Sequence, residues 1–194
     1  MQPAILTASG RWIDFVAPDP QQIFLVDIAD ALANIKRFTG HSPMSVADHS
    51  LLVADLVECD IGGNPGAELM ALMHDAHEAF TGDISSPMKS MIGEDRVAEI
   101  ENRVREAIFE SLGLLLLERC SAHLIAVKTC DMIALEIERR LFFPEHENWP
   151  AITRFDYPQS MIPKIRALEK SGRYPGGDWL ERVLACEIAM KNRQ

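Results

Sequence analysis

Four side chains that can bind a divalent metal ion occur along the chain: His49, the adjacent pair His74 and Asp75, and Asp131. Two imidazoles and two carboxylates form a mixed nitrogen and oxygen ligand set. Such a set suits a borderline or hard divalent ion that keeps coordination positions open for water and substrate. A closed structural zinc site would more often use cysteine. The four residues therefore predict a catalytic metal centre, with Mn, Co, Mg, Fe and Zn all left open as the ion.

A further carboxylate, Glu78, follows His74 at the i, i+4 spacing of a helix. On a continuous helix this spacing puts both side chains on one face. Glu78 is therefore predicted to stand beside the metal as a general acid or base, or as a group that orients water. A zinc-protease motif that begins at His77 and Glu78 is excluded, because the second histidine that it needs is replaced by Thr81.

The segments that carry these residues show helical rather than alternating patterns, so the fold class is predicted to be all-α. Ser45 and Asp48 form a capping-box pattern that starts the helix bearing His49. Gly113 is a predicted helix break. The expected helices cover 27–38, the segment from Ser45 onward, 67–80, 94–117, 122–143, a short stretch at 162–170, and a last helix after Asp178.

The ordered pattern H…HD…D on helices resembles the HD-domain superfamily of metal-dependent phosphohydrolases. The resemblance is closer to the branch that contains YfbR-like 5′-deoxynucleotidases and phage deoxynucleoside triphosphohydrolases. It covers about 23–140 and rests on IKRF, SVADHSLLVA, LMHDAHEAFTGDISSPMK and KTCDMIALEIE. It implies that 1–194 is one HD-domain helical bundle, with a loop-rich part and a final helix in 144–194 packed on it.

The same resemblance assigns roles to individual residues. His49, His74, Asp75 and Asp131 match the metal ligands, of which Asp75 also serves catalysis, and Glu78 matches the catalytic carboxylate. Arg37 matches the arginine that orients the phosphate, and Phe38 falls where the deoxynucleotidases have a tryptophan beside the sugar. The loop that lines the nucleotide pocket matches Asp83, Ile84, Ser85 and Ser86.

These roles imply a metal-dependent nucleotide phosphohydrolase. The first expectation is a 5′-nucleotidase that releases phosphate from deoxynucleoside monophosphates. The alternative is a triphosphohydrolase that acts on deoxynucleoside triphosphates such as dATP. A further alternative is a nucleotide-binding HD domain without catalysis. The resemblance to a family whose members form oligomers and the apolar segments 104–117 and 122–143 also predict a homodimer or a larger homo-oligomer.

Charge and composition exclude other classes of function. The 19 basic and 29 acidic residues give a net charge of −10, which disfavours binding to nucleic acid or to an anionic membrane surface. Neither a membrane-spanning apolar run nor a secretory signal pattern is recognised, so a cytoplasmic location is expected. The four cysteines form no CxxC pair and are expected to be reduced thiols in the core.

Overall fold

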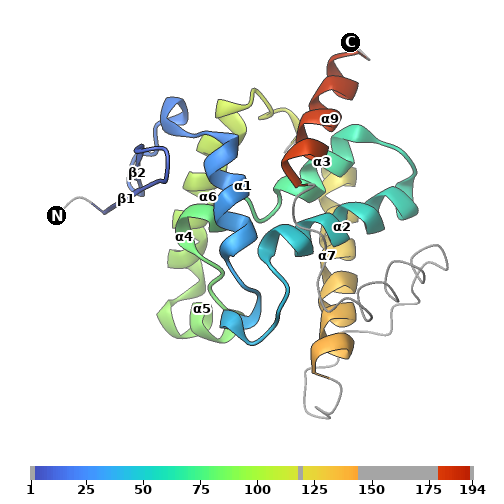
Figure 1. Cartoon of the computed structure of the whole chain (residues 1–194), viewed down its shortest axis with the longest axis horizontal. Helices are drawn as coiled ribbons and strands as arrows, with labels where there is room; N and C mark the ends of the chain where they lie inside the picture. Colours follow the sequence, from blue (N-terminus) through green and yellow to red (C-terminus); the bar gives the residue numbers. More distant parts are fainter. Residues whose placement is uncertain (1–2, 118–119, 144–178, 193–194) are drawn as a thin grey trace.

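Helix α2 (Val46–Ile61) forms the centre of the structure, a computed structural model that describes residues 3–117, 120–143 and 179–192. Helices α3 and α7 both pack against α2 (Figure 1). Helix α9 covers α3, and α1 contacts both α2 and α4. The other helices are α1 (Leu25–Asn34), α3 (Pro65–Met73), α4 (Glu78–Thr81), α5 (Ser86–Ile92), α6 (Glu94–Ser111), α7 (Ser121–Phe142) and α9 (Trp179–Lys191).

The all-α prediction is confirmed, since helices dominate the described residues. The helix predicted at 162–170 and the cap at Asp178 lie outside the described residues. No helix of the described part is both long and apolar enough to cross a membrane.

The capping box that starts α2 is confirmed in full. The Ser45 hydroxyl accepts from the Asp48 amide, and the Asp48 carboxylate accepts from the Ser45 amide at 2.9 Å. This reciprocal pair satisfies amides that a helix start leaves without partners. Twelve of the sixteen residues of α2 are buried, so the helix runs through the core with His49 in its first turn.

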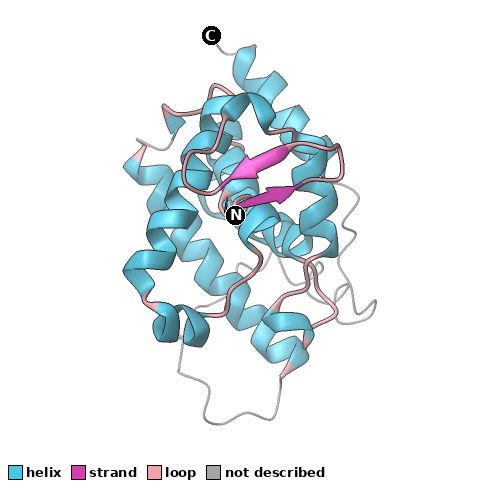
Figure 2. Ribbon diagram, turned by 90° about the vertical axis from the view of Figure 1, so that its left-hand side faces the viewer, coloured by secondary structure: helices cyan, strands magenta, loops and turns pink. Residues whose placement is uncertain are grey.

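One short β-hairpin departs from the predicted fold. Strands β1 (Ala4–Leu6) and β2 (Trp12–Asp14) pair antiparallel in front of the helices (Figure 2). Ile13 of this hairpin is fully buried, and the Asp27 carboxylate of α1 accepts from the amide and hydroxyl of Ser9 in the connecting turn. Strands of three residues are too short to show an alternating pattern, which is why the sequence analysis found no strand.

Three predicted helices end earlier than the sequence pattern indicated. The helix expected over 94–117 ends at Ser111, just before the predicted break at Gly113. The other two affect the site. The first stops at Asn34, so Arg37 follows α1 rather than lying on it. The second, predicted over 67–80, is divided into α3 and α4 by a turn at 74–77.

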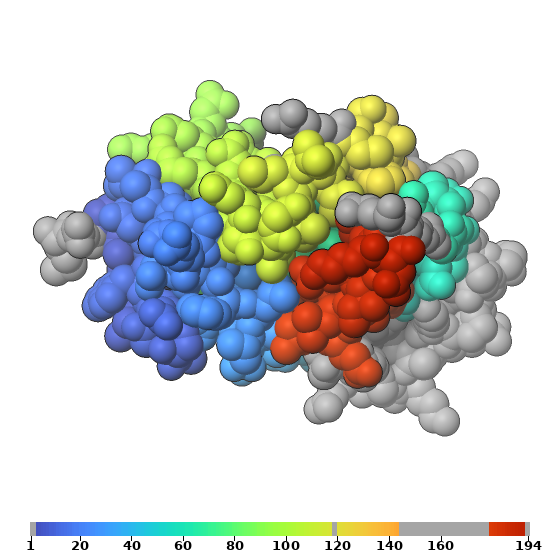
Figure 3. Space-filling model, turned by 90° about the horizontal axis from the view of Figure 1, so that it is seen from above, coloured from blue at the N-terminus to red at the C-terminus, as the bar shows by residue number. Residues whose placement is uncertain are grey.

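Helix α9 binds the C-terminal end of α3 through one buried side chain. Trp179 is almost fully buried, and its indole N–H donates to the Leu72 carbonyl at 2.9 Å. Figure 3 shows α9 on the upper face of the molecule. The C-terminal helix thus supports the end of α3 that leads into the candidate site.

The prediction that all four cysteines are core residues is wrong in part. All four are free thiols, as expected, but only Cys130 and Cys186 are buried. Cys120 is partly exposed, and Cys59 lies exposed near the end of α2.

Candidate metal centre

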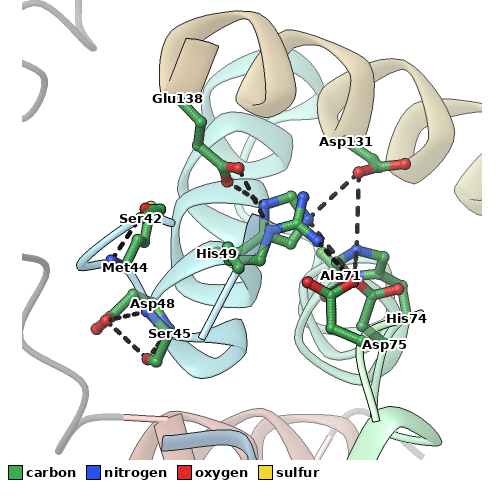
Figure 4. Close-up of polar contacts among 12 residues, drawn as sticks. Ser42, Met44, Ser45, Asp48, His49, Ala71, His74, Asp75, Asp131 and Glu138 are labelled. Atoms are coloured by element: carbon green, nitrogen blue, oxygen red, sulfur yellow. Dashed lines mark hydrogen bonds and ion pairs between the residues drawn. The ribbon is translucent and has the colours of Figure 1, made fainter. Parts of the chain in front are cut away.

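Two helices and one turn bring the four predicted metal ligands together. Ligand atoms of His49, His74 and Asp131 all lie within 4.8 Å of one another. The Asp131 Oδ1 atom is 3.3 Å from His49 Nε2 and 4.0 Å from His74 Nε2. The Asp75 Oδ2 atom is 3.1 Å from His74 Nε2 and 3.6 Å from His49 Nε2. Figure 4 shows the Asp131 side chain extending from α7 toward the two histidines.

Both histidines present the ring nitrogen that a metal needs. The Nδ1 atom of His74 is 2.7 Å from the Ala71 carbonyl, and the Nδ1 atom of His49 bonds Glu138. Since both partners are acceptors, each Nδ1 carries the proton. The two Nε2 atoms are buried without a hydrogen-bond partner. Metal-binding histidines characteristically have this arrangement, so the donor set fits a divalent ion.

The charges around the cluster are those of a cation site. Burial lowers the pKa of His49, but the carboxylates of Glu138 and Asp131 outweigh it and raise the pKa to about 10. Burial raises the pKa of Asp131, but the two histidines hold it well below its ordinary value.

The turn at 74–77 places the adjacent residues His74 and Asp75 at one point. Its backbone amides bond three residues back: Ala76 to Met73 at 3.1 Å, and Glu78 to Asp75 at 2.9 Å. This tightening replaces the continuous helix on which the i, i+4 argument for Glu78 rested. On a regular helix the side chains of adjacent residues point about 100° apart. In the tightened turn, the side chains of both His74 and Asp75 reach the same cluster.

Glu78 begins α4 and is buried, with 4 % of its surface exposed. Its Oε2 atom has no hydrogen-bond partner. Burial, followed by the carboxylates of Asp75 and Asp83, raises the pKa of Glu78 to about 9. In the metal-free protein this carboxyl group therefore holds a proton at neutral pH.

The backbone on either side of Lys36 is held against the backbone at the start of α2 by two hydrogen bonds, and we call this pair of bonds the backbone neck. The Arg37 amide donates to the Met44 carbonyl and the Val46 amide donates to the Ile35 carbonyl, both at 3.0 Å. Lys36 and Ser45 form the bridge between these bonds. Because Val46 is also the first residue of α2, the neck holds Arg37 against the helix that carries His49.

The segment after Arg37 has strained backbone. Phe38 and Thr39 have φ values of 55° and 57°, which lie in the left-handed backbone region that residues other than glycine rarely adopt. The Phe38 ring contacts the Phe143 ring edge-on at 5.0 Å, and the Arg37 guanidinium lies 5.6 Å from the Phe38 ring centre. Phe38 thus flanks the arginine, and its role beside the sugar stays a prediction.

The predicted pocket loop is only partly brought to the site. Asp83 forms an ion pair with Arg37, with 3.8 Å between Oδ1 and Nη1. Ile84, Ser85 and Ser86 continue the chain into α5. Among the described residues, no polar contact joins these three to the metal cluster, so their roles stay predictions.

Glu138 is the site residue that the sequence analysis missed. It is fully buried, bonds His49 Nδ1, and accepts from Arg37 Nε at 3.3 Å. It lies seven residues after Asp131 on α7. Positions i and i+7 share one face of a helix. The sequence therefore offered one signal for Glu138, namely that it lies on the same helix face as the predicted ligand Asp131.

Fold and site together define an all-α protein with a buried His/His/Asp group that can hold a metal ion, as in HD-type hydrolases. No family model matches the chain. The chain is 33% identical to the uncharacterised protein YfdR of Escherichia coli over 78% of this chain and 83% of YfdR. It therefore belongs to the same family as YfdR.

Two other relatives match over shorter segments. An uncharacterised protein of Rhodobacter capsulatus is 40% identical over 55% of this chain and 56% of its own length. The dATP triphosphohydrolase of Salmonella phage PMBT28 is 34% identical over 53% of this chain and 55% of its own length. The match thus spans about half the length of each of these two relatives. The phage relative is a distant one whose name describes a phosphohydrolase.

Proposed function

We propose that this protein is a metal-dependent phosphohydrolase that releases triphosphate from deoxynucleoside triphosphates. The observation that carries the proposal is the cluster of His49, His74 and Asp131, in which both Nε2 atoms are buried, form no hydrogen bond and face carboxylate oxygens. The similarity to a phage dATP triphosphohydrolase supports the substrate class. It favours the triphosphate alternative over the monophosphate reaction that the sequence analysis put first.

The reaction breaks one phosphorus–oxygen bond. Water attacks the α-phosphorus, the bond from that phosphorus to O5′ breaks, and O5′ takes a proton. The products are a deoxynucleoside and triphosphate. Hydrolysis of a deoxynucleoside monophosphate breaks the equivalent bond, so both candidate reactions need the same groups around the reacting phosphorus.

The residues of the cluster would divide this work. His49, His74, Asp75 and Asp131 would hold the divalent ion, which supplies an activated nucleophile near neutral pH and neutralises charge on the phosphate. Arg37 would bind phosphate oxygens through its planar fork of N–H donors. Glu78 would donate a proton to O5′ or orient the water.

A second cation supports a substrate with several phosphates. Lys89 of α5 bonds Glu101 at 2.9 Å, and its pKa is raised because this bond and the charges of Glu101, Glu78 and Asp75 outweigh burial. Lys89 therefore lies within electrostatic reach of the cluster. A triphosphate carries more negative charge than one arginine and one divalent ion balance, and Lys89 would meet the remainder by exchanging its ion pair with Glu101 for a phosphate oxygen.

The test is a product assay with the purified chain and Mn²⁺ or Co²⁺. Substrates are dATP, dAMP, ATP and AMP. Products are separated by anion exchange; nucleosides are identified by ultraviolet absorbance, and phosphate products by ³¹P NMR after the metal ion is removed with EDTA. We expect triphosphate and deoxyadenosine from dATP. Orthophosphate from dAMP alone would favour the 5′-nucleotidase instead. Nucleotide binding with no product from any nucleotide would favour the non-catalytic alternative and refute both hydrolase assignments.

We also propose that the chain forms a homodimer or larger homo-oligomer. Exposed apolar side chains gather where α6 leads into α7. Leu116 is 76% exposed, Leu124 44% and Ile125 68%. Apolar surface of this kind is commonly buried between subunits.

A further inference from the structure

A single buried carboxylate contacts two groups that the proposed reaction needs. Glu138 is fully buried, and its two oxygens have different partners. Oε1 bonds the Nδ1 atom of His49, and Oε2 accepts from Nε of Arg37. Figure 4 shows Glu138 approaching His49 from α7, on the side away from His74.

Such a carboxylate is expensive to keep in the core. Removing a charge from water costs several kcal/mol, which is offset only when its oxygens are well paired. Burial raises the pKa of Glu138, but His49 and Arg37 outweigh it and hold the pKa below its ordinary value. Since apolar side chains of similar size often serve stability equally well, the position of Glu138 calls for a role in the site.

The geometry points to Glu138 as a positioning residue that couples His49 to Arg37, so that the metal ligand and the phosphate-binding arginine are oriented together. Through Oε1 it keeps the proton of His49 on Nδ1 and directs Nε2 toward the metal cluster. Through Oε2 it fixes the edge of the guanidinium that bears Nε. This inference rests on the proposed function for the role of Arg37, but not for the role of His49.

The coupling requires two acceptors side by side. His49 Nδ1 and Arg37 Nε both present N–H groups, and only a carboxylate offers two acceptor oxygens at that spacing. A glutamine has the same shape but one acceptor and one N–H₂ donor. In Glu138→Gln the amide oxygen can therefore accept a hydrogen bond from either His49 or Arg37. The amide N–H₂ group then faces the N–H of the other residue, and two donors cannot form a hydrogen bond.

The matched control is Glu136→Gln. Glu136 is also a buried glutamate of α7, with 5% of its surface exposed, but it bonds Arg139 and Arg140 away from the cluster. Comparing the two variants separates a role in the site from the general effect of removing a buried carboxylate from this helix.

The first measurement is Mn²⁺ affinity of the full chain by isothermal titration calorimetry. We expect Glu138→Gln to weaken binding roughly 10–100-fold, the usual effect of losing a partner of a metal-binding histidine, and Glu136→Gln to leave it unchanged. Glu138→Asp keeps the charge on a shorter side chain and should lose less affinity than Glu138→Gln. Equal affinities for wild type, Glu138→Gln and Glu138→Asp would overturn the inference.

The second measurement is steady-state kinetics at saturating Mn²⁺ with Arg37→Ala, Glu138→Gln and the double variant. A positioning role predicts that Glu138→Gln raises KM and that Arg37→Ala raises it by a smaller factor in the Glu138→Gln background than in wild type. A merely structural role would lower the active fraction and leave KM unchanged. Equal factors in both backgrounds would refute the coupling. If no nucleotide is hydrolysed, the proposed function fails, while the Mn²⁺ affinities still decide the role of Glu138 toward His49.

Discussion

The burial of Glu78 makes a testable prediction about the stability of the metal-free protein. Its pKa rises from an ordinary value of 4.5 to about 9 in the folded chain. At pH 7 the unfolded chain carries Glu78 ionised while the folded chain carries it protonated. Each pKa unit corresponds to about 1.4 kcal/mol, so the 2.5 units between 4.5 and pH 7 cost folding about 3 kcal/mol.

The pH dependence follows from the direction of this shift. Because the folded pKa is raised, the protonated group's contribution to stability is complete below pH 4.5 and is lost as the pH rises toward about 9. Glu78→Gln keeps the shape of the protonated acid and cannot ionise. The variant should therefore exceed wild type in unfolding free energy by less than about 1 kcal/mol at pH 5 and by about 3 kcal/mol at pH 7.

The assay is urea unfolding of both proteins in EDTA at pH 5, 6, 7 and 8. The difference at pH 7 corresponds to a melting temperature higher by roughly 6–12 °C in a chain of this size. Glu106→Gln, at an exposed position of α6, is the matched control and should show no such trend. A difference between Glu78→Gln and wild type that stays constant with pH, or a variant less stable than wild type throughout, would refute the argument from burial.

Further predictions concern the metal, the phosphate and the assembly. Asp75→Ala should lose both Mn²⁺ binding, measured by calorimetry, and activity. Glu78→Gln should still bind Mn²⁺ but lose turnover at least 100-fold, which is the lower end of the range for a proton-transfer group. Full activity of Glu78→Gln would contradict the role of Glu78. Because His49 holds a proton up to a pKa of about 10, Mn²⁺ binding should release protons, and the affinity should rise with pH between 6 and 9; calorimetry in buffers of different ionisation enthalpy measures the release. Arg37→Lys should raise KM for the nucleotide at least 10-fold, since an ammonium cannot replace the planar fork. Ile125→Glu should convert a dimer into a monomer in light scattering, and an unchanged mass would contradict the proposed interface.

Local signals in the sequence were enough to predict the part of the site built on α2. Ser45 and Asp48 are three residues apart, and their bonds form within one turn, so the helix start and the place of His49 follow from the pattern alone. The order of the four predicted metal ligands likewise predicted a cluster of side chains that the structure brings together.

The parts that could not be predicted depend on contacts between distant segments. The apolar spacing of Leu69, Leu72 and Ala76 continues through the turn at 74–77, so periodicity indicated one helix. The Leu72 carbonyl instead accepts from Trp179, more than a hundred residues away in the chain. Glu138 was missed for the same reason, because nothing near it in the sequence shows that its partners are His49 and Arg37.

The backbone neck between Arg37 and α2 has an evolutionary consequence. The two hydrogen bonds that close it hold Arg37 and the start of α2 in place on either side of residues 38–43. Gly40 and His41 are exposed within that excursion. Extending a loop of this kind by a few residues changes its closure entropy by less than about 1 kcal/mol. Relatives can therefore differ in the distance from the arginine to the first histidine while keeping both in register, and insertions beside Gly40 offer a place to reshape substrate preference without rebuilding the metal centre.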